Sequence, residues 1–203
     1  MRKTIIAASA ALALSLTASS AFAGTLVNPS VALSTYAPSQ PVAITAKHTT
    51  VTPLSAHQFI LRLHLPTDFG DIITADQTGN CTGLTLKVDN IVQTGPSAPT
   101  CSIFTNRSIW VWTNVPVAAG AEIEVNLDNT FFRNSATPGV KPMVRFETAD
   151  GGGHEIDRAS PMPTVTIIAP APVPTMTEWA MILLTACLGG FAALTIQRRR
   201  RTV

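Results

Sequence analysis

Residues 121–128 read AEIEVNLD and decide the fold class, because apolar and polar residues alternate through the whole stretch. Successive side chains of a β-strand point to opposite faces, so this alternation places one face on a core and the other toward water. No segment between residues 24 and 170 carries a sustained helical repeat. The same alternation recurs in shorter runs at 42–47, 59–65, 84–89, 144–147 and 165–167. The middle of the chain is therefore predicted to be built from strands.

Turn signals separate these runs, among them Asn28-Pro29, Thr94-Gly95-Pro96 and Gly151-Gly152-Gly153. Short strands with frequent turn residues and no intervening helices are typical of an antiparallel sandwich. We therefore predict one all-β ectodomain over residues 24–168, an antiparallel β-sandwich of Ig-like architecture with roughly seven to nine strands. The stretch from Leu65 to Asn126 also resembles the Ig-like repeats of bacterial surface proteins.

The N-terminus has the three parts of a secretory signal peptide. Arg2 and Lys3 supply the positive start, and the run that follows them carries no charge as far as Ala21-Phe22-Ala23. Small residues at Ala21 and Ala23 fit the A-x-A pattern that precedes cleavage. We predict a signal helix over residues 1–23 that is removed on export, with a retained membrane-anchoring helix as the alternative.

The C-terminus contains a second uncharged run, residues 179–197, which reads WAMILLTACLGGFAALTIQ. A helix of that length would be about 28 Å long, close to the roughly 30 Å hydrocarbon thickness of a bilayer. The basic tail Arg198, Arg199, Arg200 and Arg201 follows and resists translocation. The run is therefore predicted to be a transmembrane helix with the ectodomain outside the cytoplasm. A soluble core helix would need a polar face, which the run lacks.

The net charge of the ectodomain differs in sign from that of the whole chain. The chain has 14 Lys and Arg against 12 Asp and Glu, a net charge of +2. Six of the cations lie in the two targeting segments, which leaves the ectodomain 8 cations against 11 acids. No cluster of Lys and Arg remains to meet phosphates, so the sequence excludes a nucleic-acid partner on electrostatic grounds.

A short motif lies between the ectodomain and the uncharged run. An alternating Ala/Pro linker at residues 169–174 is expected to be an extended spacer. The motif overlaps its end and consists of Val173, Pro174, Thr175, Met176 and, after two further residues, Trp179. It is followed by the apolar run and the four arginines.

This tail, residues 173–203, resembles the IPTL-CTERM protein-sorting signal of Gram-negative bacterial envelopes. That signal has Ile-Pro-Thr-Leu, two residues, Trp-Gly, an apolar span and a basic cluster. Pro174, Thr175 and Trp179 match it, whereas Val173, Met176 and Ala180 replace Ile, Leu and Gly. The resemblance implies recognition by an exosortase-type membrane peptidase, removal of the tail and delivery toward the cell surface. A plain single-pass anchor is the alternative.

Cysteine usage agrees with export. Cys81 and Cys101 are the only cysteines of the predicted ectodomain, and an envelope compartment is oxidising. We predict a disulfide between them, which would stabilise the fold by about 3 kcal/mol. Cys187 lies within the apolar run, where it is expected to act as a small apolar residue.

Motifs of enzyme chemistry are missing from the sequence. The four histidines, His48, His57, His64 and His154, form neither H-E-x-x-H nor a zinc spacing. His48 and His57 flank a loop and are expected to be exposed, and His64 is expected to share a solvated strand face with Arg62. No G-x-S-x-G elbow and no P-loop lysine occur. We predict a protein that is not an enzyme and binds no metal or cofactor.

Two segments keep other functions open. Trp110 and Trp112 fall on one face of a predicted strand and could stack on sugars or on a partner if they are exposed. Residues 150–157, which read DGGGHEID, could hold a calcium ion or form a hairpin tip. The same segment offers His154, Glu155 and Asp157 as an unrecognised hydrolase site.

Together these features predict an exported envelope or surface protein with a non-enzymatic, structural or adhesive role. Its ectodomain would first face the periplasm from the inner membrane and reach the cell surface or the medium after sorting. A carbohydrate- or matrix-binding module is the first alternative, and a secreted hydrolase is the second.

Overall fold

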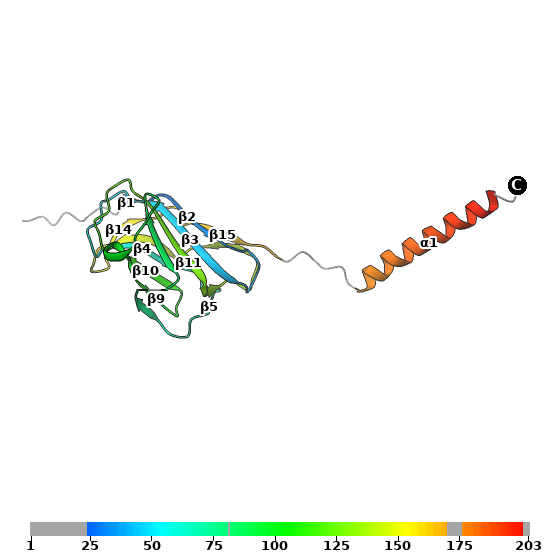
Figure 1. Cartoon of the computed structure of the whole chain (residues 1–203), viewed down its shortest axis with the longest axis horizontal. Coiled ribbons are helices and arrows are strands. Elements are labelled where there is room, and N and C mark those ends of the chain that lie inside the picture. The colour runs from blue at the N-terminus through cyan, green and yellow to red at the C-terminus, as the bar shows by residue number, and fades with distance from the viewer. Residues whose placement is uncertain (1–23, 81, 170–175, 201–203) are drawn as a thin grey trace, which may run out of the picture.

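The computed structural model describes residues 24–80, 82–169 and 176–200 (Figure 1). The predicted signal peptide, Cys81, most of the Ala/Pro linker and the sorting residues Val173, Pro174 and Thr175 lie outside the described residues. Residues 24–80 and 82–169 contain 15 strands. The prediction of roughly seven to nine strands was too low. Strands of two residues, such as β1 (Gly24–Thr25), are too short to show an alternation in the sequence.

The strands of the described residues form two large sheets and one small sheet, and every strand pair except β1 with β14 is antiparallel. The first sheet contains, in spatial order, β1, β14 (Glu155–Arg158), β13 (Arg145–Ala149), β4 (Phe59–His64), β10 (Ser108–Trp112), β9 (Thr100–Ile103) and β6 (Gln77–Gly79). The second sheet contains β2 (Val27–Leu33), β3 (Pro41–Thr49), β11 (Glu122–Arg133), β7 (Leu84–Val88) and β8 (Ile91–Val92), and β5 (Gly70–Asp71) also pairs with β11. The third sheet pairs β12 (Gly139–Pro142) with β15 (Thr164–Ile167). A 3-10 turn, Gly95–Ser97, lies between β8 and β9.

One hydrophobic core takes side chains from both large sheets. On β11, Ile123, Val125 and Leu127 are at most 1% exposed, whereas the residues between them are not buried. Leu63 of β4 and Ile109 of β10 belong to the same core and are equally buried. The alternation of residues 121–128 therefore places the apolar side chains on the core face, as predicted. The prediction of an antiparallel all-β region is confirmed.

The prediction that His48 is exposed was wrong, because β3 is longer than the run at 42–47. The strand continues to Thr49, and its buried residues alternate through Val42, Ile44, Ala46 and His48. His48 therefore keeps the inward side of the strand and is only 1% exposed. Its ring stands perpendicular to the ring of Phe146 of β13, with 5.6 Å between the ring centroids.

The helix α1 (Met176–Arg200) contrasts with the sheets (Figure 1). All residues from 179 to 193 are exposed, including Leu183 at 64% and Phe191 at 70%. Among the described side chains of the helix, none of residues 179–193 belongs to the core of the sheets. Within the described residues, no helix reaches the combined length and hydropathy that a membrane crossing requires. The crossing predicted for residues 179–197 stays a prediction.

Candidate functional site

The outer side of the first sheet carries a group of aromatic side chains. On β10, Ile109 and Val111 are fully buried, and the alternate residues Trp110 and Trp112 are half-buried. The two tryptophans therefore share the face that points away from the core, as their spacing predicted. We call the group formed by Phe59, Phe104, Trp110, Trp112 and Arg62 the aromatic surface.

Phe59 belongs to this surface because β4 contains a bulge. Val111 pairs with Leu61 but Trp112 pairs with Phe59, so Ile60 is the extra residue. A bulge of this kind reverses the facing of the residues beyond it. Phe59 is buried, as the alternation predicted, at 5% exposed, but for this reason it does not share the core face of Leu61. Its ring instead contacts Trp110 and Trp112, at centroid distances of 5.7 and 4.5 Å.

The rings of the aromatic surface touch one another in a continuous row. Phe104 meets Trp110 with centroids 4.8 Å apart, and Trp110 meets Trp112 at 6.4 Å. These distances lie in the range where aromatic pairs attract, each by about 0.5–1.5 kcal/mol beyond the burial of area. The mutual contacts fix the ring positions, so part of each tryptophan is presented to solvent in a defined orientation.

Arg62 lies beneath this row and was wrongly predicted to face solvent. It is 9% exposed, and its guanidinium carbon lies 5.1 Å from the ring centroid of Trp110 and 5.4 Å from that of Phe59. Its Nη1 donates to the Gly153 carbonyl at 2.6 Å and lies 3.1 Å from Oε1 of Glu147. The guanidinium charge of Arg62 is therefore stabilised both by the two aromatic rings and by the ion pair with Glu147.

Glu147 is the anionic partner and is only 4% exposed. Burial raises the pKa of Glu147 above its ordinary value, and the positive charges of Arg145 and Arg62 oppose that shift. Nε of Arg145 lies 3.6 Å from the same carboxylate. The aromatic surface therefore has a buried polar base that holds Arg62 in place under the rings.

In the segment 150–157, residues 150–154 form the tip of the hairpin between β13 and β14, and residues 155–157 belong to β14. Oδ1 of Asp150 accepts hydrogen bonds from the amides of Gly152 and His154, at 2.9 and 2.8 Å. The ring Nδ1 of His154 lies 3.0 Å from the other carboxylate oxygen, and hydrogen bonds from His154 lower the pKa of Asp150. In the described part of the chain, no group of three or more His, Cys, Asp or Glu is placed to hold a metal ion.

The residues of the hydrolase alternative do not converge. The side chain of His154 is 86% exposed, whereas Asp157 is fully buried. Asp157 accepts hydrogen bonds from the amides of Gly24 and Thr52 and from the Thr52 hydroxyl. Glu155 instead forms a 3.8 Å ion pair with Arg158.

The other two histidines differ in how well they match the predicted exposure. His57 is exposed, as predicted. His64 is half-buried, with its Nδ1 2.8 Å from the Ser108 hydroxyl. Burial lowers the pKa of His64, and the charges of Arg107 and Arg145 lower it further.

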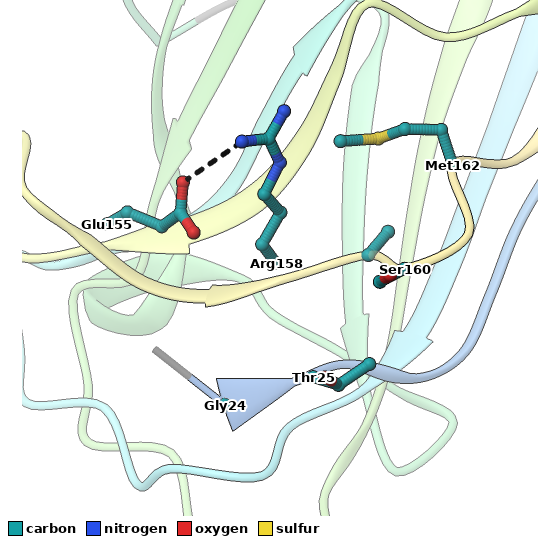
Figure 2. A pocket seen from close by; sticks show the side chains of 7 residues that line it. Gly24, Thr25, Glu155, Arg158, Ser160 and Met162 are labelled. Carbon is teal, nitrogen blue, oxygen red and sulfur yellow. Dashed lines mark ion pairs between the residues drawn. The ribbon is translucent and has the colours of Figure 1, made fainter. Parts of the chain in front are cut away.

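A cavity of about 410 Å³ between β1 and the end of β14 was not predicted from the sequence (Figure 2). It is lined by Gly24, Thr25, Glu155, Arg158, Ala159, Ser160 and Met162. The residues of β1 and β14 stand more than 130 positions apart in the chain, as the 133-residue separation of Gly24 and Asp157 shows. No local pattern could have revealed this pairing.

Two residues of the sorting motif lie in the described helix. Met176 begins α1, and Trp179 follows within its first turn and is 53% exposed. Arg198, Arg199 and Arg200 are the last residues of the same helix. One continuous helix thus joins the end of the motif to the basic cluster.

Comparison with protein families identifies this tail. Residues 171–201 match the IPTL-CTERM motif. The match includes Pro174, Thr175 and Trp179, so the resemblance inferred from these residues is confirmed. No curated protein and no solved structure matches the chain. The C-terminal tail is therefore a sorting signal of the IPTL-CTERM type, attached to an all-β region.

Proposed function

We propose that this chain is an exported cell-envelope protein whose C-terminal signal delivers a non-enzymatic, all-β ectodomain to the cell surface or the medium. The observation that carries the proposal is the match of residues 171–201 to a sorting motif directly after a folded β-region. The ectodomain then has a structural or adhesive role outside the cell.

The route begins with cleavage of the predicted signal peptide after Ala23. The helix α1 then crosses the membrane and Arg198 to Arg201 stay in the cytoplasm. An exosortase-type peptidase recognises the motif and releases the ectodomain. The apolar side chains of residues 179–193 support this route, because they are exposed and lie outside the core cluster, and they are compatible with lipid.

Processing in a bacterium that contains such a peptidase tests the route. The wild-type chain is expected to change from a longer to a shorter form during a pulse-chase experiment. Trp179→Ala removes the motif tryptophan and is expected to block the change, whereas Met181→Ala, in the apolar span that follows that tryptophan, is expected to leave it intact. A longer form that persists unchanged in the wild type would mean that the tail is a plain anchor.

A second candidate function is carbohydrate or matrix binding at the aromatic surface. Trp110 and Trp112 are half-buried, so they offer ring area to a ligand while Phe59 and Phe104 hold them in place. Stacking on aromatic rings and a polar rim suit a sugar. The side chain of Arg145, which is 45% exposed, would supply a polar contact.

Glycan-array binding tests this second candidate. Trp112→Ala is expected to abolish a signal seen with the wild-type chain. Tyr36→Ala is the matched control, because Tyr36 is 40% exposed and lines a different cavity with residues of β2 and β15. Binding that survives Trp112→Ala, or that fails equally in both variants, would remove the aromatic surface as the binding site.

We treat a secreted hydrolase as the least supported alternative. Its three residues face three different surroundings, with His154 in solvent, Glu155 at a cavity and Asp157 buried. A general base and a nucleophile must lie within hydrogen-bond reach of each other. Hydrolytic activity lost in Glu155→Gln but kept in Asp150→Asn would restore the hydrolase and overturn the non-enzymatic role.

We also propose the disulfide between Cys81 and Cys101. Cys101 of β9 is 1% exposed and pairs in register with Gly79 of β6, from which the chain reaches Cys81 two residues later. Alkylation of the unfolded, unreduced protein is expected to label only Cys187, which is a free exposed thiol. Labelling of Cys101 without reduction would exclude the bridge.

A further inference from the structure

The first strand begins at the predicted cleavage position. Cleavage after Ala23 would make Gly24 the first residue of the mature chain, and β1 starts at Gly24. The strand pairs in parallel with β14, with Gly24 opposite Asp157. Leu26 donates its amide to the Arg158 carbonyl at 3.0 Å and is 3% exposed. The residues that follow the cleavage position are therefore held firmly against β14 (Figure 2).

Asp157 is a buried carboxylate that forms no ion pair among the described residues. It is fully buried, and its oxygens accept hydrogen bonds from the Gly24 amide at 3.1 Å and from the amide and hydroxyl of Thr52 at 2.9 Å each. Among the described residues, no Lys or Arg forms an ion pair with it. Acidic side chains are almost never fully buried unless they are paired with a positive charge.

His48 does not supply the missing charge. Burial lowers the pKa of His48 to about 4, although the charge of Asp157 opposes that shift. The imidazole is therefore neutral near pH 7. Neither of its ring nitrogens has a hydrogen-bond partner. A cation for Asp157 must come from another group.

We propose that Asp157 is the acceptor for the α-ammonium group that signal-peptide cleavage creates at Gly24. Hydrolysis breaks the bond between the Ala23 carbonyl carbon and the Gly24 nitrogen. The hydroxyl of water joins that carbon, a hydrogen joins the nitrogen, and the new amine takes up one more proton. The group that donates to Asp157 thus becomes a cation without changing its position. The inference rests on the export step of the proposed function.

The residue at position 24 and its surroundings suit this role. A Cβ at Gly24 would lie 2.3 Å from Oδ1 of Asp157, so any larger residue would push the nitrogen away from the carboxylate. Gly24 is half-buried and lines the cavity of about 410 Å³ (Figure 2). The ammonium group can therefore keep water on its open side, which reduces the cost of desolvating the charge.

A four-protein comparison of the full chain in detergent tests the ion pair. The processed form and a form that retains residues 1–23 through Ala23→Leu are each prepared with Asp157 and with Asp157→Asn. Urea unfolding is followed by tryptophan fluorescence. Processing is expected to lower the unfolding equilibrium constant about 100-fold with Asp157 and by less than about threefold with Asp157→Asn. Asp150→Asn, whose carboxylate bonds only within its own hairpin, is the matched control and should preserve the large effect.

A second readout needs no variant. The α-amine of the native, processed chain is expected to react with a methylating reagent about tenfold more slowly than in urea. The Nζ group of Lys47, whose side chain is 44% exposed, provides an internal reference. Equal reaction rates of the α-amine in both states would overturn the ion pair, as would an equal effect of processing with Asp157 and with Asp157→Asn.

N-terminal sequencing separates this inference from the export proposal. A chain that begins at Gly24 with a freely reactive amine overturns the ion pair alone. A processed chain that begins at another residue also overturns the ion pair and leaves export standing. A chain that keeps residues 1–23 in a cell with an active signal peptidase contradicts both.

Discussion

The sheets and α1 are both rich in apolar residues, but these residues end in opposite environments. In the sheets, Ile123 and Leu63 are at most 1% exposed, whereas Leu183 and Phe191 of α1 are 64% and 70% exposed. The difference follows from periodicity. Alternation with a period of two gathers apolar side chains on one face, which another sheet can cover. The apolar residues of α1 surround the helix without a polar face, so one neighbouring element could not cover them all.

The largest expected contrast comes from truncating a buried and an exposed apolar side chain. Phe146→Ala, at a fully buried site of the core, is expected to lower the free energy of unfolding of the ectodomain by about 4 kcal/mol. Leu183→Ala, on α1, is expected to change it by less than about 0.5 kcal/mol. Urea denaturation of the full chain in detergent measures both. A loss of similar size in the two variants would mean that α1 packs on the sheets.

The next contrast compares two ion pairs of the first sheet. Arg62→Met leaves the buried carboxylate of Glu147 with only its longer contact to Arg145, and is expected to cost about 3 kcal/mol. Arg158→Met breaks an exposed pair with Glu155 and is expected to cost less than about 1 kcal/mol. Thermal unfolding distinguishes the two. Equal and small losses would show that Arg62 does not anchor the aromatic surface.

A smaller effect is expected from lowering the pH. The pKa of His48 is about 4 in the folded chain and about 6.5 in the unfolded chain. The unfolded chain therefore binds the proton more tightly. The contribution of neutral His48 is complete above about pH 6.5 and is lost as the pH falls toward 4. Between pH 6.5 and 5 the loss from this group is about 2 kcal/mol.

Denaturation curves at several pH values measure this loss. His48→Leu is expected to flatten the pH dependence between 4 and 6.5, whatever its effect on the absolute stability. The control is Val42→Ala, at a buried site of the same strand that carries no titratable group, and it should leave the pH dependence unchanged. An unchanged pH dependence in His48→Leu would contradict the assignment to the buried histidine.

The sequence predicted which residues face the core wherever the strands are regular. Ile123, Val125 and Leu127 are buried as their spacing required, and His48 would have been placed correctly if β3 had been extended by two residues. Phe59 could not have been placed, because the bulge at Ile60 is set by pairing with β10 and not by the local pattern.

Whether a candidate site could be predicted also depended on how far apart its residues lie in the sequence. The sorting signal depends on a short continuous motif, and the shared face of Trp110 and Trp112 depends on residues two apart, so both could be predicted. The base of the aromatic surface pairs Arg62 with Glu147, and the N-terminal site pairs Gly24 with Asp157. Both pairs join residues distant in the chain, and only the sheet topology brings them together.

The central claim is that α1 lies in the membrane and does not pack on the sheets. The most direct test is to measure the intact mass of the protein in two fractions, the membrane and the cell surface or medium. The expected result is a membrane form that begins at Gly24 and retains α1, together with an outer form that has lost the helix and keeps the folded sheets. A single soluble form that extends through Val203, with Leu183 protected from solvent, would contradict it.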